Sequence, residues 1–144
     1  MATTGIRDVW PANLTGPVTV NPVAVLRRQA EALGEKTHNF VIGEVETTPV
    51  ASGTMFEHSF VLVAPFLRFR FPLLRVTHRI QPYPATVAET DLTKPIDAKF
   101  WNTTAQDEKE LLTALEEFFA TDRVVSLVRS LITQSNDYAP EDDN

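Results

Sequence analysis

The apolar positions between residues 104 and 134 recur at the spacing of two consecutive amphipathic helices. Thr121 and Asp122 are suited to begin the second helix, and the spacing of Thr104 and Asp107 resembles a capping box for the first. A third helix is predicted near the N-terminus. Asn21-Pro22 is a favourable helix start, apolar residues follow at helical spacing, and Gly34 indicates the helix end.

Residues 39–89 show strand patterns instead. We predict strands over residues 39–47 and 56–64, a long strand within Phe66–Ile80, and a short edge strand over Ala85–Glu89. No helical pattern separates them, which favours a four-stranded antiparallel meander. The predicted fold class is therefore α+β: an N-terminal helix, the meander, and two C-terminal helices packed on one face of the sheet.

The alternation of apolar and charged residues in the Phe66–Ile80 segment shifts by one position near its middle. Apolar residues occupy odd-numbered positions from Leu67 to Phe71 but even-numbered positions from Leu74 onward. One strand keeps a single apolar face across that change only if an extra residue is inserted near Pro72, so we predict a β-bulge there. The bulge would place four arginines on the same side of the strand: Arg68, Arg70, Arg75 and Arg79. The alternative is a loop over Pro65–Pro72 that displays its Phe and Arg side chains.

The chain divides into three parts in this interpretation. Residues 1–20, which include Pro11, Gly16 and Pro17, are predicted to form an irregular lead-in. Residues 21–134 form a single domain, in which residues 91–102 make a loop held to the core by Phe100 and Trp101. Residues 135–144 form a polar, acidic tail that we expect to be disordered.

Composition restricts the classes of function. The chain contains no cysteine, which excludes disulfides, thiolate nucleophiles and Cys-ligated metals. A net charge of −6 argues against a general affinity for nucleic acid or anionic membranes. No apolar run approaches the roughly 20 residues that a membrane span requires, and the first residues lack the pattern of a secretory signal. We expect a cytoplasmic protein without a membrane partner.

The sequence contains no recognisable catalytic or phosphate-binding motif, so we predict no catalytic residue and no cofactor. The histidines His38, His58 and His78 are spaced twenty residues apart and are weak candidates for a metal site, because neutral imidazole is a common zinc ligand. We favour cross-strand hydrogen bonding for His58 and His78. Glu44 and Glu46 could act as a paired acid and base, but a solvated sheet face explains them more simply.

The leading functional hypothesis is a small non-catalytic protein-interaction module, such as an adaptor, chaperone-like or inhibitor subunit. Its partner, a protein or a second copy of the chain, would contact the arginine-lined sheet face. One alternative is a nucleic-acid-binding protein using the same basic strand. A second alternative is an enzyme or metal site built on the histidines. The arginines could also pair with Glu44, Glu46 and Glu57 and serve no partner at all.

Overall fold

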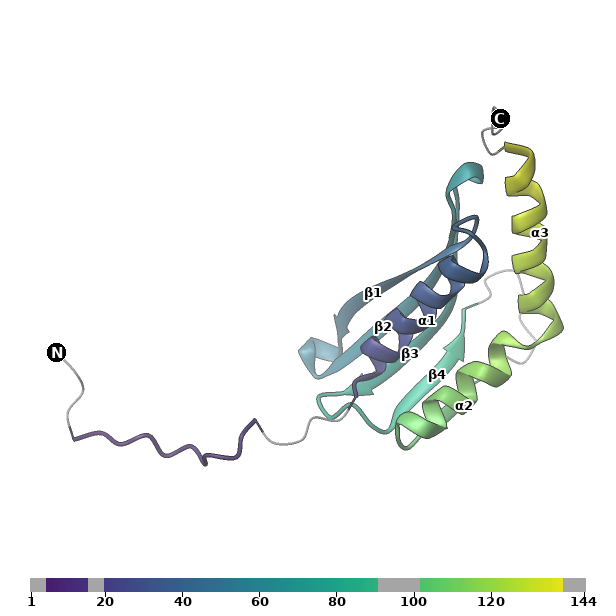
Figure 1. The fold of residues 1–144 in the computed structure, drawn as a ribbon. Coiled ribbons are helices and arrows are strands. Elements are labelled where there is room, and N and C mark those ends of the chain that lie inside the picture. The colour runs from purple at the N-terminus through teal and green to yellow at the C-terminus, as the bar shows by residue number, and fades with distance from the viewer. Residues whose placement is uncertain (1–4, 16–19, 91–101, 139–144) are drawn as a thin grey trace.

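The computed structural model describes residues 5–15, 20–90 and 102–138. These residues form three α-helices and one five-stranded sheet (Figure 1): α1 (Pro22–Lys36), β1 (Ile42–Val50), β2 (Met55–Ala64), β3 (Phe69–Arg79), β4 (Ala85–Glu89), β5 (Asn102–Ala105), α2 (Glu108–Phe119) and α3 (Asp122–Tyr138). Short 3-10 turns, η1 (Ala51–Gly53) and η2 (Pro65–Leu67), connect the first three strands. The strand order is β1-β2-β3-β4-β5, and every neighbouring pair is antiparallel. The predicted α+β class is confirmed.

The fifth strand is an addition to the predicted sheet. β5 pairs with β4 from Ala85 opposite Ala105 to Ala88 opposite Asn102. Its Asn-Thr-Thr-Ala sequence lacks the apolar alternation that marks a strand, so pairing with β4 determines its conformation. The capping-box prediction for Thr104 is wrong for the same reason, since Thr104 belongs to this strand. Asp107 caps α2 instead and accepts a hydrogen bond of 2.9 Å from the amide of Glu110.

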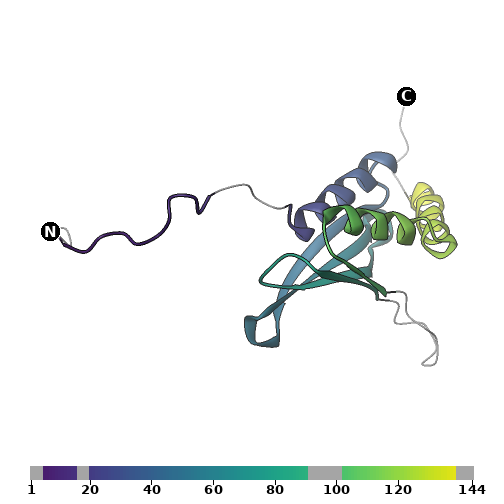
Figure 2. The same ribbon diagram turned by 90° about the horizontal axis from the view of Figure 1, so that it is seen from below.

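The three helices in the described ranges lie on one face of the sheet (Figure 2). Phe60, Leu62, Leu74 and Val76 of the sheet are buried beneath them. The helices contribute a matching set of buried side chains: Val25, Leu26, Ala30, Leu111, Ala114, Leu115, Phe118, Val124 and Leu131. The described residues of the opposite sheet face carry no helix.

Gly43 sets the approach of α1 to β1. A Cβ atom at this position would lie 2.7 Å from the Cβ of Ala30 and 2.9 Å from the Cζ of Phe60. Both separations are shorter than van der Waals contact, so the side chain must be absent for α1 to pack at its observed depth. The helix therefore covers the sheet directly above the Gly43–Phe60 contact.

Two helices extend beyond their predicted ends. α1 continues through Gly34 to Lys36, and the amide of Thr37 closes it with a 3.1 Å bond to the carbonyl of Leu33. α3 continues past residue 134 to Tyr138, and Ser135 is buried one turn after Leu131. Residues 135–138 are thus helical, and the rest of the predicted tail lies outside the described residues. Residues 5–15 of the lead-in contain no helix or strand.

The predicted bulge is present. Phe60 pairs with Leu74, but the next residue of β2, Val61, pairs with Pro72, so Leu73 is the inserted residue of β3. The register places Arg70, Arg75 and Arg79 on one side of β3. Arg68 is a correction: it precedes β3, at the end of η2, with a left-handed φ of 51°. The turn geometry at Pro65–Leu67 removes it from the row of arginines.

Candidate functional site

Charged side chains gather on the sheet face opposite the helices. Glu44 and Glu46 project from β1, Glu57 from β2, and Arg70 and Arg75 from β3. We call these five residues the ionic face. In β1 the two glutamates are separated by one residue, so both side chains emerge on the same side of the strand. The bulge at Leu73 then keeps Arg70 and Arg75 on that side despite their odd spacing.

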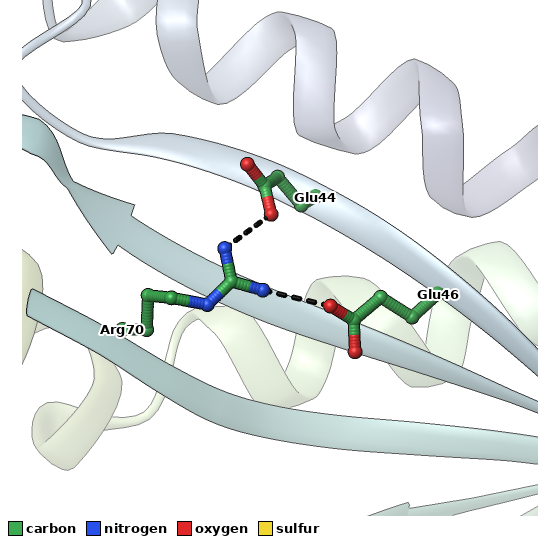
Figure 3. Close-up of polar contacts among 3 residues, drawn as sticks. All are labelled: Glu44, Glu46 and Arg70. Carbon is green, nitrogen blue, oxygen red and sulfur yellow. Dashed lines mark hydrogen bonds and ion pairs between the residues drawn. The ribbon is translucent and has the colours of Figure 1, made fainter.

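Arg70 connects β3 to β1 across the intervening strand β2 (Figure 3). Its Nη1 atom donates to Oε2 of Glu44 at 2.5 Å, and its Nη2 atom donates to Oε1 of Glu46 at 2.7 Å. Arg70 lies opposite Val63 of β2, and the glutamates lie on the far side of that strand in β1. The guanidinium therefore reaches over β2 and holds both carboxylates at once, a fixed geometry that a lysine could not reproduce.

The other arginines are bound less closely. The Nε atom of Arg75 lies 4.0 Å from Oε1 of Glu57, at the limit of an ion pair. Arg79 is exposed at the end of β3, and Arg68 is exposed in the turn before it. Within the described part of the chain, neither Arg68 nor Arg79 forms an ion pair. Of the four arginines in the predicted row, Arg70 is held closely and Arg75 is paired loosely. Arg79 has no ion pair among the described residues, and Arg68 lies outside the row.

The charges of this surface are close to balance. Three carboxylates, from Glu44, Glu46 and Glu57, lie among the three arginines of β3. The hydrogen bond that Arg70 donates to Glu44 raises the pKa of Arg70 above its ordinary value, so its guanidinium stays charged. About half of each side chain in the Arg70–Glu44 pair is exposed. Ion pairs this open to water contribute little to folding stability. Folding stability is therefore a weak explanation for the arrangement of Arg70 and the glutamates.

The aromatic residues of β3 lie on the other side of the strand. Phe69 and Phe71 are partly buried against the hydrophobic core, with nearly parallel rings whose centroids are 6.2 Å apart. This agrees with the single apolar face that the bulge gives to the strand. The sheet separates them from Arg70 and Arg75, so this strand does not combine arginine and aromatic side chains on a single surface.

His58 and His78 meet on the helix-covered face. Their Nε2 atoms are 2.8 Å apart, Nδ1 of His58 lies 2.8 Å from the hydroxyl of Thr47, and Nδ1 of His78 lies 2.5 Å from the carbonyl oxygen of Arg79. Since that carbonyl only accepts, Nδ1 of His78 carries a proton. Its Nε2 atom then accepts from Nε2 of His58, whose Nδ1 accepts from Thr47. The predicted cross-strand hydrogen bonding is confirmed.

The structure does not assemble the three histidines. His38 precedes the Ile42 end of β1, whereas His58 pairs with Thr47, about 16 Å farther along that strand. Among the described residues, no group of three or more His, Cys, Asp or Glu side chains is placed to hold a metal ion. The ring nitrogens of His58 and His78 already have hydrogen-bond partners, which leaves the pair without a lone pair directed at a ligand. Burial lowers the pKa of His58 from 6.5 to about 4, with a further contribution from the neighbouring His78 and Arg27.

Sequence analysis missed a second feature, a cleft between α1 and α3. We call it the apolar cleft; its volume is about 390 Å³, and its lining includes Leu33, Phe60, Phe119, Val125 and Val128. The apolar stripes of both helices are visible in the sequence. Those stripes predict burial, however, and the incomplete contact between them arises only from how the two helices pack.

Glu89 and Arg123 form another contact that the sequence did not reveal. Glu89 lies opposite Leu74 on the helix-covered face, where its side chain is 1% exposed, and its carboxylate pairs with the guanidinium of Arg123 at the start of α3. A buried carboxylate is costly unless it is paired. This contact connects the end of β4 to α3 beside the apolar cleft, whose lining includes Val124.

Comparisons with family models, with curated proteins and with solved structures found no match to this chain. In the described ranges, none of the helices has both the length and the apolar character needed to cross a membrane.

Proposed function

We propose that this chain is a small, non-catalytic interaction module that binds a protein partner through the ionic face. The observation that carries the proposal is the Arg70 bridge, because it fixes one guanidinium and two carboxylates on the sheet face opposite the helices. A fixed pattern of both charges gives a protein partner specificity through complementary charges of its own. We propose a cytoplasmic location as part of this account, on the basis of the cysteine-free composition.

Charge balance favours a protein partner over a nucleic acid. Binding to phosphates requires an excess of positive charge, whereas the carboxylates of Glu44, Glu46 and Glu57 match the arginines of β3. Bases also need exposed aromatic surfaces for stacking, and Phe69 and Phe71 pack on the opposite face. No observation favours a metal or a catalytic role for the paired histidines His58 and His78.

A variant with the charges of the ionic face exchanged tests whether the face binds a partner, independently of its effect on folding. The triple variant Arg70→Glu, Glu44→Arg, Glu46→Arg retains the possibility of ion pairs across β2 but reverses the charge pattern. Tagged wild-type and swapped chains would be incubated with an extract of the native host, and captured proteins compared by quantitative mass spectrometry. We expect the wild type to enrich at least one specific protein, or its own untagged copy, and the swapped chain to lose it.

A matched control carries the same net change at a distance. Replacing the exposed Glu116 and Glu117 on α2 by glutamine, as Glu116→Gln with Glu117→Gln, raises the net charge by +2 as the triple variant does, leaves the sheet untouched and should preserve recovery. Circular dichroism would show that each variant is folded. Equal recovery by the swapped chain and the wild type would mean that the ionic face is only an internal charge network.

A further inference from the structure

We propose that the apolar cleft binds an amphipathic anion, a molecule with a slender alkyl chain and a carboxylate head. This site lies on the helix-covered side of the sheet and does not rest on the proposed function of the ionic face. Its volume of about 390 Å³ falls within the range of small-molecule pockets, roughly 300–1,000 Å³. The class of ligand follows from the walls, the floor and the charges of the cleft.

The walls are two helix faces. Gln29, Ala32, Leu33 and Lys36 follow one another at helical spacing on α1, so they form one stripe. Val124, Val125, Val128 and Arg129 form the facing stripe on α3. The apolar residues Leu33, Val125 and Val128 of these stripes are only partly buried. The structure thus leaves apolar helix surface that a ligand could cover.

The floor of the cleft is apolar. Phe60 and Leu62 of β2 are 2% and 1% exposed, and Leu73, the inserted residue of the bulge, is 5% exposed. These side chains close the cleft against the sheet, and the lining residues of α1 and α3 flank it. An apolar floor between apolar walls suits an alkyl chain, which gains affinity from each methylene that it removes from water.

The charged residues of the lining that the structure describes are both positive. Lys36 and Arg129 are exposed cations of the lining, and none of the described lining residues is acidic, although the chain carries a net charge of −6. In the part of the chain that the structure describes, neither has an ion-pair partner. Each is the last lining residue of its helix, and α1 and α3 run in the same general direction (Figure 1). Both cations therefore lie toward one end of the cleft, where they would receive a carboxylate while the alkyl chain extends toward Gln29.

Isothermal titration calorimetry with dodecanoate below its micelle concentration tests the proposal directly. We expect saturable binding, and binding of octanoate that is much weaker, because each buried methylene contributes roughly a three- to fourfold gain in affinity. Dodecyltrimethylammonium has the same alkyl chain and the opposite charge, and should bind roughly tenfold more weakly. The double variant Lys36→Glu, Arg129→Glu should reverse the preference between the two head groups. Lys109→Glu, on the exposed side of α2, is a charge reversal away from the cleft and should change nothing.

A second variant tests the location. Val128→Trp fills the cleft and should abolish binding of both probes, while the charge-swapped ionic face described above should bind dodecanoate like the wild type. Failure to bind dodecanoate would overturn the proposal, as would binding that survives Val128→Trp in a folded protein. Equal affinity for the two head groups would also overturn it, and would indicate instead a surface for the apolar side chains of a protein.

Discussion

Nε2 of His58 lies 2.8 Å from Nε2 of His78 beneath the helix layer, and both rings are largely excluded from water. The hydrogen-bond chain from Thr47 to the carbonyl oxygen of Arg79 needs only neutral imidazoles. A second proton on His58 would have to enter a buried site beside another ring and Arg27, which is why the pKa of His58 falls to about 4.

This arrangement predicts a loss of stability in mild acid. The unfolded chain takes up a proton at His58 near pH 6.5, whereas the folded chain does so only near pH 4. The histidine therefore costs no stability above about pH 6.5, and the free energy of unfolding falls as the pH drops from 6.5 to 4. The difference at the acid end is about 3 kcal/mol for His58 alone.

Urea unfolding at several pH values measures this effect. Carboxylates also titrate in this range, so the informative quantity is the difference in slope between the wild type and His58→Gln. We expect the variant to be less stable at pH 7.5 but to lose less free energy between pH 6.5 and 4. His38→Gln, at an exposed position, should follow the wild type. Parallel profiles for the wild type and His58→Gln would show that the pair is not the acid-sensitive element.

Replacement by alanine is predicted to lower the stability of the protein at Gly43 and to raise it at Gly34. Gly43→Ala forces a methyl group against Ala30 and Phe60 in a packed core, which should cost roughly 1–3 kcal/mol. A Cβ atom at Gly34 would lie 3.0 Å from the side-chain Oδ1 of Asn39, which can rotate away, and 3.6 Å from Cγ2 of Ile42, which is ordinary van der Waals contact. Alanine is also the better helix former by roughly 1 kcal/mol. Thermal unfolding of both variants would contradict the packing argument if Gly43→Ala were as stable as Gly34→Ala.

The buried carboxylate of Glu89 predicts a large effect at Arg123. Arg123→Met removes a positive charge that faces Glu89 and should lower the free energy of unfolding by roughly 1–3 kcal/mol, because the buried carboxylate loses a charged partner. Arg129→Met changes an exposed cation of the same helix and should shift stability by less than about 0.5 kcal/mol. Chemical denaturation would refute the ion-pair account if the two variants were equally stable.

The fold was predictable wherever one residue pattern decided the local structure. The change of parity between Phe71 and Leu74 required an inserted residue, and Leu73 is that residue. Where several weak signals competed, tertiary packing decided the outcome. Glycine at position 34 is typical of a helix end, but α1 continues through it to Lys36. Asn102–Ala105 has no strand pattern, yet it completes the sheet by pairing with β4.

The candidate site was predictable in part. The sequence indicated that Arg70 and Arg75 share a face and that Glu44, Glu46 and Glu57 could reach them, since strand periodicity fixes the side on which each emerges. It could not show that Arg70 alone would hold two glutamates, because that contact depends on how the guanidinium crosses β2. The apolar cleft and the Glu89–Arg123 pair were invisible for a related reason: both depend on where α3 packs on the sheet.

Site-specific crosslinking tests the central claim, that the ionic face recognises a protein, most directly. The chain has no cysteine, so one thiol at Thr48→Cys places a photoactivatable crosslinker on the exposed side of β1, opposite Glu57. Thr113→Cys, exposed on α2, places it on the other side of the molecule. With the partner recovered from the native host, we predict a crosslink from position 48 and none from position 113. A crosslink from position 113 alone would contradict the account and transfer recognition to the helices.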